Sequence, residues 1–547
     1  MVMAKIGKNL IEMLLFSMYP DPKIIYREYI QNAFDAITKA VNDGILGQTK
    51  DGLIEVKISG VGQNIIIRDN GCGVSRDNIS VLLDIADSTK DGISSAGVYG
   101  IGRLVGAGYC EKLVFRTSAV GENQASIVSF DSAKAKRIIA DKLNKSSASE
   151  VVEQISSITY ESCNENEHFF EVELSKVATA YANDLLNEDT VIEYLRNVAP
   201  IDFSTVFKKA IISSSIEKSP EYDEFYHSIP YVTISVNGES DLRKRYGLKV
   251  DGTAGKIGGE DDRILNLEFF TLEDKKYGVL AKGWFAVTKF SVAINEANKS
   301  RGIRLRMHNI QIGDAEYLDQ YHKEKRGNTY FYGEIHTINE NLKPTTDRSA
   351  LAPTEEAKAL QKLIREQFLS MYYLYSNANK AKSKVSDIHT KVVNIGAAKS
   401  QDDVNSDVNI ISKNLGEIER LQQSSDKAPK VAMQTVLAAY KSAATSEIDA
   451  NAEVKSKIEL TKTSDKVDGY RPDKENGVSA AVEDPKQSHT RIVTDIFAPL
   501  KGKYSAEELK LIRKCYMLFT KNCPVQLKMD MMNVWAKAIK ELEKDAR

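Results

Sequence analysis

The sequence predicts an α+β protein, and three stretches close to its start carry the prediction. Residues 22–37 have the periodicity of a helix, residues 64–69 are rich in β-branched side chains as strands are, and residues 97–106 are rich in glycine. Each stretch also holds polar or glycine residues that an ordinary core element would not need. Together they indicate a ligand site built from helix, strand and loop.

The helix expected over residues 22–37 has one polar face. Glu28, Asn32 and Asp35 recur at i, i+4 and i+7 and share that face, while isoleucines, Ala33 and Phe34 make up the rest. A buried carboxyl or amide without a partner costs roughly 1–3 kcal/mol, so we expect this face to point into a cavity that binds something. The alternative is a surface helix with a polar stripe, against which the next two stretches argue.

Two glycine-containing motifs follow. The strand 64–69 stops at Asp69 in an Asp-x-Gly-x-Gly sequence that ends at Gly73, where the glycines allow a sharp turn and leave the carboxylate as an acceptor. Gly97-x-x-Gly100-x-Gly102 then leads into an apolar segment. Such a loop can bind phosphates through its N–H groups and the N-terminus of the following helix.

In this order the three motifs resemble the N-box and the two glycine boxes of the GHKL ATPase superfamily. That superfamily includes gyrase B, the ninety-kilodalton heat-shock chaperones, MutL proteins, histidine kinases and MORC proteins. The sequence is most similar to the heat-shock chaperone branch (HtpG-like), well over residues 5–200 and more loosely over 280–350. The resemblance implies a Bergerat-type α/β sandwich over residues 1–204 and a Mg²⁺-dependent ATPase (ATP hydrolase).

The resemblance also implies roles for individual residues. Asp69 would accept the exocyclic amine of adenine, Asn32 would be a ligand of Mg²⁺, and Glu28 would orient or deprotonate the attacking water. Asp35 is expected to be a structural acceptor. Further contacts to the nucleotide are implied for Gly73, Lys90, Gly97, Gly100, Gly102 and Thr117.

Within the first domain the alternation of apolar and polar residues predicts strands and helices in detail. We expect strands at 53–59, 64–69, 112–118, 125–131 and 167–174, and helices at 5–18, 79–85 and 191–198. The glycine-rich segment 92–108 is expected to be a mobile lid over a nucleotide.

A second, α/β domain is expected over residues 205–375, with strands at 231–236, 270–271, 277–286 and 330–338. Its segment 341–351 is similar to the chaperone loop that carries an arginine to the terminal phosphate. Arg348 falls on that arginine, whereas Thr345 stands where the family has Asn. An arginine supplied by another domain would make hydrolysis conditional on the docking of the two domains.

Four basic residues alternate in the second domain, at Lys299, Arg301, Arg304 and Arg306. A phosphate-binding patch is one interpretation. We favour the other, the solvated face of a strand.

Residues 376–488 differ in composition from the rest. They contain two aromatic residues, Tyr440 and Tyr470, among many Ser, Lys, Asp, Asn and Ala, which predicts a partly disordered linker. Apolar residues at heptad spacing over 385–395 and 404–418 predict two short helices in it. Self-association and packing within the chain are equally compatible with these heptads.

The tail, residues 489–547, is predicted to form a small helical module. A capping box at 505–508 opens a first helix, and Pro524 separates it from a second. Residues 501–547 carry eleven basic and six acidic side chains. A dimerisation module, a docking site for a partner that includes nucleic acid, and a capping bundle all fit this pattern.

Composition limits the class of protein. The net charge of −2 gives no global basic field of the kind expected of a dedicated DNA-binding protein. Five scattered cysteines show neither metal-ligand spacing nor a disulfide framework, and no stretch reaches 18 apolar residues. We therefore expect a cytoplasmic protein without a membrane anchor.

Two functions remain open at this point. The first is an ATP-driven clamp of the chaperone type, a homodimer that acts on a protein client or partner protein. The alternative is a GHKL ATPase that acts on DNA or in genome or phage defence, as MutL and MORC proteins do, with the basic tail as its DNA contact.

Overall fold

The computed structural model describes residues 21–83, 102–239, 242–250, 262–345, 347–396, 400–423, 428–452 and 454–456, with Lys8, Glu12 and Ile458. The chain divides into two units, 1–466 and 467–547, and all described residues belong to the first. The predictions for residues 459–488 and for the module 489–547 lie outside the described residues, as does nearly all of the helix expected over 5–18.

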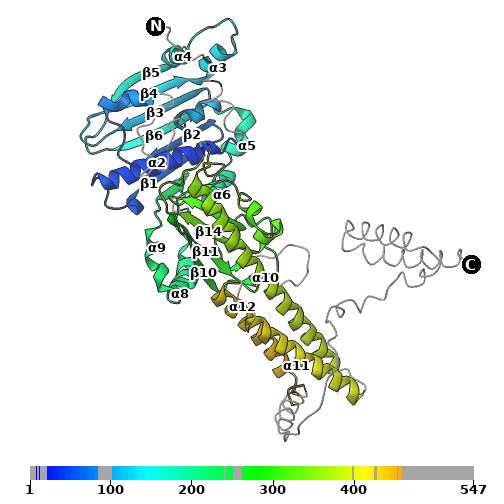
Figure 1. The fold of residues 1–547 in the computed structure, drawn as a ribbon. Coiled ribbons are helices and arrows are strands. Elements are labelled where there is room, and N and C mark those ends of the chain that lie inside the picture. Colours follow the sequence, from blue (N-terminus) through cyan, green and yellow to red (C-terminus); the bar gives the residue numbers. More distant parts are fainter. Residues whose placement is uncertain are drawn as a thin grey trace, which may run out of the picture. The chain divides into compact units, whose positions relative to one another are not determined.

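The first domain is built on a seven-stranded sheet (Figure 1). Its strand order is β5-β4-β3-β6-β2-β1-β7, antiparallel except for the parallel pair β1–β7. The strands are β1 Leu53–Ser59, β2 Asn64–Asp69, β3 Lys112–Ser118, β4 Gln124–Asp131, β5 Ser156–Ser162, β6 Phe169–Ser175 and β7 Thr233–Val236. The strands predicted at 53–59, 64–69 and 112–118 are confirmed residue for residue.

Helices cover one face of this sheet and share a core with it. Because side chains alternate along a strand, Ile65 and Ile67 of β2 point to the same side, where they pack with Ile25 and Ile37 of the first long helix. The helices are α2 Ile24–Asn42, α3 Ser132–Ala140, α4 Ala148–Ile155, α5 Ala182–Leu185 and α6 Glu188–Val198. In the described part of the helix expected at 79–85, the chain instead forms a short 3₁₀ helix, Arg76–Leu82, in which Ile79 and Leu82 are buried.

The edge strand β7 comes from a part of the sequence that was expected to lie in the second domain. After α6 the chain forms α7 Thr205–Phe207, a π-helical turn, α8 Ser213–Ile216 and α9 Asp223–Ser228, and then returns to pair β7 with β1. The strand itself was predicted, at 231–236. Its partner was not, because an edge strand has the same local pattern whichever sheet it joins.

The second domain has a five-stranded sheet of order β10-β11-β14-β12-β13. Its strands are β10 Asn266–Asp274, β11 Gly278–Val287, β12 Gly302–Met307, β13 Ile310–Ile312 and β14 Tyr332–Thr337, and a separate small ribbon pairs β8 Lys249–Val250 with β9 Asp262–Arg263. Each face of the five-stranded sheet packs into its own apolar core. One core holds Phe203, Phe207 and Trp284, and the other holds Phe285 and Phe331.

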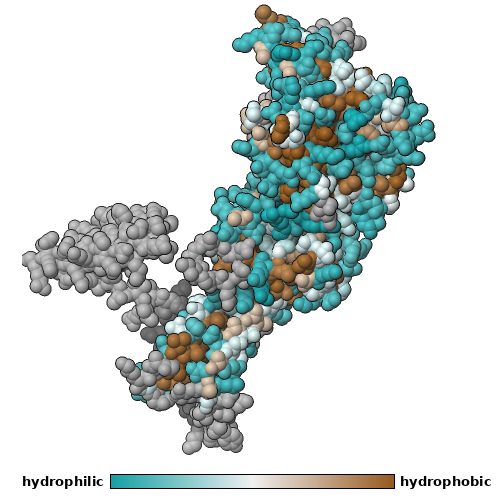
Figure 2. Space-filling view, turned by 180° about the vertical axis from the view of Figure 1, so that it is seen from behind, coloured by the Kyte–Doolittle hydropathy of each residue, from teal (hydrophilic) through white to brown (hydrophobic). Residues whose placement is uncertain are grey.

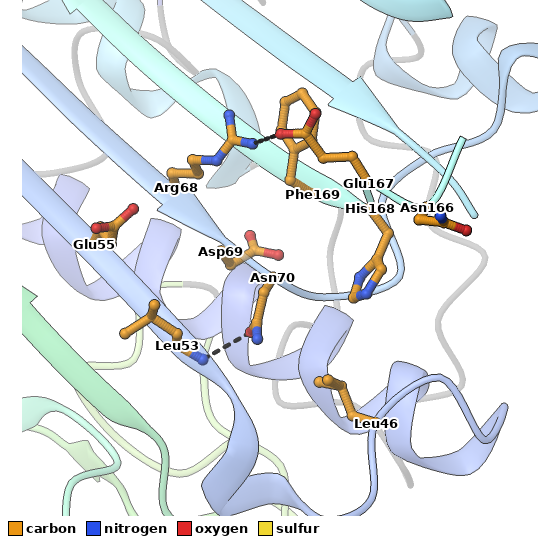
Figure 3. A pocket seen from close by; sticks show the side chains of 10 residues that line it. All are labelled: Leu46, Leu53, Glu55, Arg68, Asp69, Asn70, Asn166, Glu167, His168 and Phe169. Atoms are coloured by element: carbon orange, nitrogen blue, oxygen red, sulfur yellow. Dashed lines mark hydrogen bonds and ion pairs between the residues drawn. The ribbon is translucent and has the colours of Figure 1, made fainter. Parts of the chain in front are cut away.

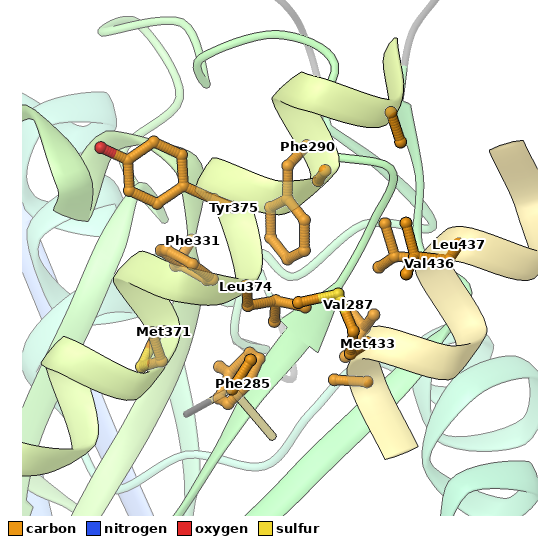
Figure 4. Packing of buried hydrophobic residues seen from close by; sticks show 14 of the residues in the cluster. Phe285, Val287, Phe290, Phe331, Met371, Leu374, Tyr375, Met433, Val436 and Leu437 are labelled. Carbon is orange, nitrogen blue, oxygen red and sulfur yellow. The ribbon is translucent and has the colours of Figure 1, made fainter. Parts of the chain in front are cut away.

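Three helices extend the second of these cores. They are α10 Glu355–Gly396, α11 Gln401–Gln423 and α12 Lys430–Asp449. Figure 4 shows Met371 and Leu374 of α10 and Met433 of α12 packed against Phe285 and Val287 of the sheet. The two short helices predicted at 385–395 and 404–418 lie within α10 and α11, and their heptad residues pack within the chain. Isoleucine, valine and alanine fill much of this core, so the low aromatic content of the segment after residue 376 does not mean that the segment is exposed.

The basic residues of β12 are also placed differently from the prediction. Every residue of β12 is buried, including Arg304 and Arg306, so the solvated face favoured for them is wrong. Arg306 forms an ion pair with the buried Glu334 of β14. The negative partner lies 28 residues away in the sequence, where local alternation cannot reveal it.

On the face drawn in Figure 2, hydrophobic residues lie in several separate groups between hydrophilic ones. None of the helices in the described part of the chain is both long enough and apolar enough to span a membrane.

Candidate functional site

The candidate site is organised around α2. Its apolar residues Ile25, Ala33 and Phe34 are buried in the core of the first domain. Glu28 and Asp35 are also buried, at 7% exposure, and Asn32 is half-buried. The expectation of a polar face within a buried helix therefore holds for the local geometry.

The first glycine box packs against α2 through its backbone. The N–H of Cys72 donates to the carbonyl oxygen of Ala36 on α2, at 3.2 Å, and the N–H of Gly71 donates to Oδ1 of Asp69, at 2.8 Å. Asp69 is buried, and burial raises the pKa of its carboxyl group to about 7, although hydrogen bonds from the Gly71 and Phe170 backbone oppose the shift. The charge of Arg68 also opposes the shift, but burial outweighs all three effects, so Asp69 is a buried acceptor held at the strand end.

Gly73 is a position where only glycine fits. Its φ is +64°, and a Cβ atom there would lie 2.0 Å from the carbonyl oxygen of Ser118. The loop therefore passes directly over the end of β3, which brings Thr117 next to it.

Thr117 lies on the same sheet face as Asp69, two strands away. Thr117 pairs with Phe170 in the strand register, and Phe170 pairs with Asp69. The Thr117 hydroxyl donates to the Phe169 carbonyl oxygen and accepts from the Val74 N–H, both at 2.8 Å. Thr117 therefore holds the glycine box in place. Sequence reasoning did not single out Phe170, which lies between the two polar residues.

Gly102 lies directly against Glu28. A Cβ atom on Gly102 would lie 2.1 Å from Oε2 of Glu28, so a side chain at residue 102 would displace the end of the Glu28 side chain. Lys90, Gly97 and Gly100, also expected in the site, lie outside the described residues, as does most of the expected lid.

The arginine loop of the second domain lies next to α2. Nη2 of Arg27 donates to the carbonyl oxygen of Asp347, at 2.8 Å, across 320 residues of sequence. Arg348 itself is 2% exposed and has a φ of +53°. The structure thus brings Arg348 into the same region as Glu28, which follows Arg27 on α2.

The loop is braced internally by Thr345, the residue that departs from the family pattern. Its hydroxyl donates to Oδ1 of Asp347, at 2.7 Å, and accepts from the Ala350 N–H. Burial would raise the pKa of Asp347, but donors on Thr345 and Ser349 outweigh it and leave that pKa lowered. Thr345 supplies a hydrogen bond that keeps the loop turned.

Two residues of this region were missed by sequence reasoning, Arg27 and His308. Arg27 stood in the quoted N-box stretch but was given no role. His308 is at the tip of the β12–β13 hairpin. Burial and the positive charge of Arg348 lower its pKa, and the negative charge of Asp35 opposes this shift. The His308 ring therefore lies within electrostatic range of Asp35 and Arg348. No local pattern could have linked His308 to α2.

A cavity of about 310 Å³ lies at the Asp69 end of β2 (Figure 3). Arg68 and Asp69 are consecutive in β2 and point to opposite faces, and both line this cavity, where Arg68 pairs with Glu167 at 2.5 Å. Its lining is Leu46, Leu53, Glu55, Arg68, Asp69, Asn70, Asn166, Glu167, His168 and Phe169.

Comparison with known proteins agrees with this geometry. Residues 22–166 match the family described as "Histidine kinase-, DNA gyrase B-, and HSP90-like ATPase". That span contains α2, both glycine boxes and β3. The resemblance of the first domain to the GHKL ATPases is therefore confirmed.

Individual relatives carry the name "Chaperone protein HtpG". The protein from Halalkalibacterium halodurans is 22% identical over 274 residues, 45% of this chain and 43% of the relative. The protein from Bacillus subtilis is 24% identical over 269 residues, 42% of each chain, and that from Frankia casuarinae is 29% identical over 137 residues, 21% of each. The chain thus aligns with less than half the length of these relatives.

Proposed function

From the premise that residues 22–166 form a GHKL-type ATPase domain, we propose that this protein binds and hydrolyses ATP and couples the reaction to docking of its two domains, as a chaperone-like clamp. The observation that carries the proposal is the hydrogen bond from Arg27 to the Asp347 carbonyl oxygen. It joins Arg27, the residue before Glu28 on the N-box helix, to Asp347, the residue before Arg348 in the arginine loop.

Adenine would bind at Asp69. A buried carboxyl with a pKa near 7 and one oxygen already held by Gly71 has acceptor capacity for an amine donor from a ligand. Guanine presents an acceptor at the corresponding position, so Asp69 would discriminate against it. The close passage of Gly73 over Ser118 keeps side chains out of this end of the site.

Phosphates and Mg²⁺ would bind along the polar face of α2. Asn32 offers an amide oxygen, a ligand type suited to Mg²⁺, which usually keeps several waters and is held largely by phosphate oxygens. No group of three or more His, Cys, Asp or Glu residues in the described part of the chain could hold a metal alone, so the nucleotide would supply most ligands. The backbone of the second glycine box, including Gly102, would donate to the phosphates.

Glu28 would act on the attacking water and Arg348 on the phosphoryl group. Glu28 is buried one turn before Asn32, where a carboxylate can orient or deprotonate a water. Arg348 would neutralise charge that develops on the terminal phosphate. When Mg²⁺ is bound it would stabilise negative charge on the phosphate oxygens.

Because Glu28 and Arg348 come from different domains, ATP would favour the docked arrangement of the two domains over an open one. Hydrolysis would remove the preference for the docked arrangement. The proposal includes a homodimer that closes on a protein client, as expected of a chaperone-like clamp.

The test is the steady-state ATPase rate of the full chain and of Glu28→Ala, with and without double-stranded DNA at two salt concentrations. We expect Glu28→Ala to lose hydrolysis by roughly 10²–10⁴-fold while ATP affinity is retained. Glu153→Ala, a change on the exposed side of α4, is the control and should leave both unchanged.

Hydrolysis that survives in Glu28→Ala would refute the assigned role of Glu28. A salt-sensitive stimulation by DNA would support the genome-associated alternative instead of the clamp. ATP-dependent compaction of a dimer without any response to DNA, followed by light scattering, would support the clamp.

A further inference from the structure

The β12–β13 hairpin connects the two domains through its tip. The tip residues His308 and Asn309 both have left-handed backbone conformations, with φ of 50° and 63°. Two consecutive left-handed residues make the tight two-residue turn that suits the twist of a hairpin. The turn projects the Asn309 side chain away from the second-domain sheet.

Asn309 is bonded to three segments distant in sequence. Its Nδ2 donates to the carbonyl oxygens of Ile201, at 3.2 Å, and Pro230, at 2.9 Å, and its Oδ1 accepts from Nζ of Lys244, at 2.7 Å. The side chain is 1% exposed. Ile201 packs in the first-domain core and Pro230 lies just before β7, so the amide joins the hairpin to the first domain.

A cluster of buried charged residues, Lys244, Arg306 and Glu334, lies at the base of the hairpin tip. Arg306 donates to the carbonyl oxygen of Asn309, at 2.9 Å, and to that of Asn197 in the last turn of α6, at 2.7 Å. Glu334 accepts from Lys244 and pairs with Arg306, at 2.8 and 2.6 Å. Since Arg306 satisfies a carbonyl at the C-terminus of α6, the cluster also belongs to both domains.

The far end of the same hairpin holds the arginine loop. The N–H of Gly313, directly after β13, donates to the carbonyl oxygen of Arg348, at 2.8 Å. The hairpin is thus bonded at its tip to the first domain and at its end to the residue expected to reach the nucleotide. A short, fully buried β strand is stiff, so a shift at one end moves the other.

We propose that Asn309 is a positioning residue that sets where the arginine loop meets α2. The inference rests on the proposed function, because it names a residue that controls the same reaction without touching nucleotide. Loss of the Asn309 amide would leave the nucleotide residues of the first domain in place and displace Arg348 from them. Catalysis depends steeply on such placement, and a misplacement near 1 Å can cost about 10²-fold.

The chain offers a matched control in Asn237. Asn237 also has a left-handed backbone, with φ of 50°, and its side chain makes three hydrogen bonds, two to Ile58 and one to Glu188. All of these lie within the first domain. Glycine accepts the left-handed conformation at both positions, so Asn309→Gly and Asn237→Gly remove side-chain bonds without backbone strain.

The experiment compares the two variants with the unmodified chain in kcat, ATP affinity and hydrogen–deuterium exchange of the peptide spanning residues 343–352. We expect Asn309→Gly to lower kcat by roughly tenfold or more, to leave the ATP dissociation constant within about twofold, and to speed exchange in that peptide. Asn237→Gly should change none of the three.

Unchanged kcat and exchange in Asn309→Gly would overturn the proposal, as would an equal loss in Asn237→Gly. If Asn309→Gly does not fold, Asn309→Asp keeps the shape and the Lys244 contact but removes both donors. The same result is expected for it, a lower kcat with an unchanged ATP dissociation constant. Failure of both to fold would make Asn309 a purely structural residue. If the unmodified chain does not hydrolyse ATP, the proposed function fails, while the exchange measurement still decides the positioning role.

Discussion

Asp69 and Glu334 are two buried carboxyl groups in contrasting surroundings. Burial raises the pKa of Asp69 to about 7, and its partners are backbone N–H groups. Burial would raise the pKa of Glu334 as well, but Arg306 and Lys244 more than reverse this and hold its pKa well below the usual value. Tyr246 and His336 add hydrogen bonds to Glu334, at 3.1 and 3.0 Å.

We propose that the difference separates a structural carboxylate, Glu334, from one that binds a ligand, Asp69. Glu334 has every partner within the chain, so its ionised form belongs to the folded state itself. Asp69 lacks a cationic partner of that kind, and its charge is best compensated by a donor that arrives from outside. On this proposal, the charge of Glu334 is compensated within the chain and stabilises the folded protein, whereas the less compensated charge of Asp69 is available to a ligand.

The largest effect is expected for Glu334→Gln. The change removes the carboxylate that pairs with the buried Lys244 and Arg306, and breaking a buried ion pair in this way costs about 3–5 kcal/mol. Glu417→Gln, which breaks the more exposed pair with Lys384, should cost at most about 1 kcal/mol. Urea denaturation followed by circular dichroism measures both. Equal midpoints for the two variants would show that the Glu334 cluster is not what joins the domains.

Asp69→Asn, in contrast, is expected to have a small effect on stability and a large effect on ATP binding. The amide no longer accepts the adenine amine as a charged group, and such hydrogen bonds contribute about 1.5–3 kcal/mol, or roughly 10–100-fold in affinity. Calorimetric titration with ATP measures the loss. Unaltered affinity would mean that Asp69 is not the adenine acceptor.

The pKa of Asp69 gives a pH dependence of known sign. Below about pH 7 the carboxyl is protonated in the free protein, and nucleotide must displace that proton, so affinity should fall by up to about tenfold per pH unit towards pH 5. Folding responds in the opposite direction. Because the folded pKa lies above the unfolded value near 3.8, the stability that Asp69 contributes is present at low pH and is lost as pH rises through 7.

The reference for this pH dependence is Asp69→Asn, which keeps any contribution from titration of the phosphates but lacks the carboxyl. The difference between the two titration curves isolates Asp69. Parallel curves from pH 5 to pH 8 would contradict the assignment.

The smallest effect is expected for Gly102→Ala. The new methyl group would meet the end of the Glu28 side chain, which can move away at little cost to stability. Under the proposed function, that movement would take the carboxylate away from the attacking water. A few-fold to tenfold fall in kcat is expected, about 1 kcal/mol in activation free energy. Gly416→Ala, in α11 with open space around it, is the control and should raise stability by about 0.5–1 kcal/mol with no change in kcat. Equal kcat values for the two variants would contradict the close approach of Gly102 to Glu28.

Local patterns were sufficient for much of the first domain. The alternation in 53–59, 64–69 and 112–118 specified three strands to the residue, and the helical spacing of Glu28, Asn32 and Asp35 identified the polar face of α2. Asp69 could be singled out because a polar residue at the end of an isoleucine-rich strand, followed by two glycines, is unusual without a ligand.

Residues whose role depends on a distant partner could not be recognised in this way. Arg306 reads as a solvated strand residue until Glu334 and Asn197 are placed beside it. Val408 and Ile411 fit self-association and packing within the chain equally well until α10 and α12 are seen to cover them. Thr117 was identified, but its hydrogen bonds to Val74 and Phe169 required the sheet.

The sequence by itself therefore determined the local elements, the polar face of α2 and the glycine boxes, because periodicity and backbone freedom are properties of neighbouring residues. Only the tertiary structure decided which charges are buried, which sheet β7 joins, and that Arg27 meets the arginine loop. Those outcomes depend on contacts between segments up to 320 residues apart, as between Arg27 and Asp347, and burial of a charge is favourable only once its partner is in place.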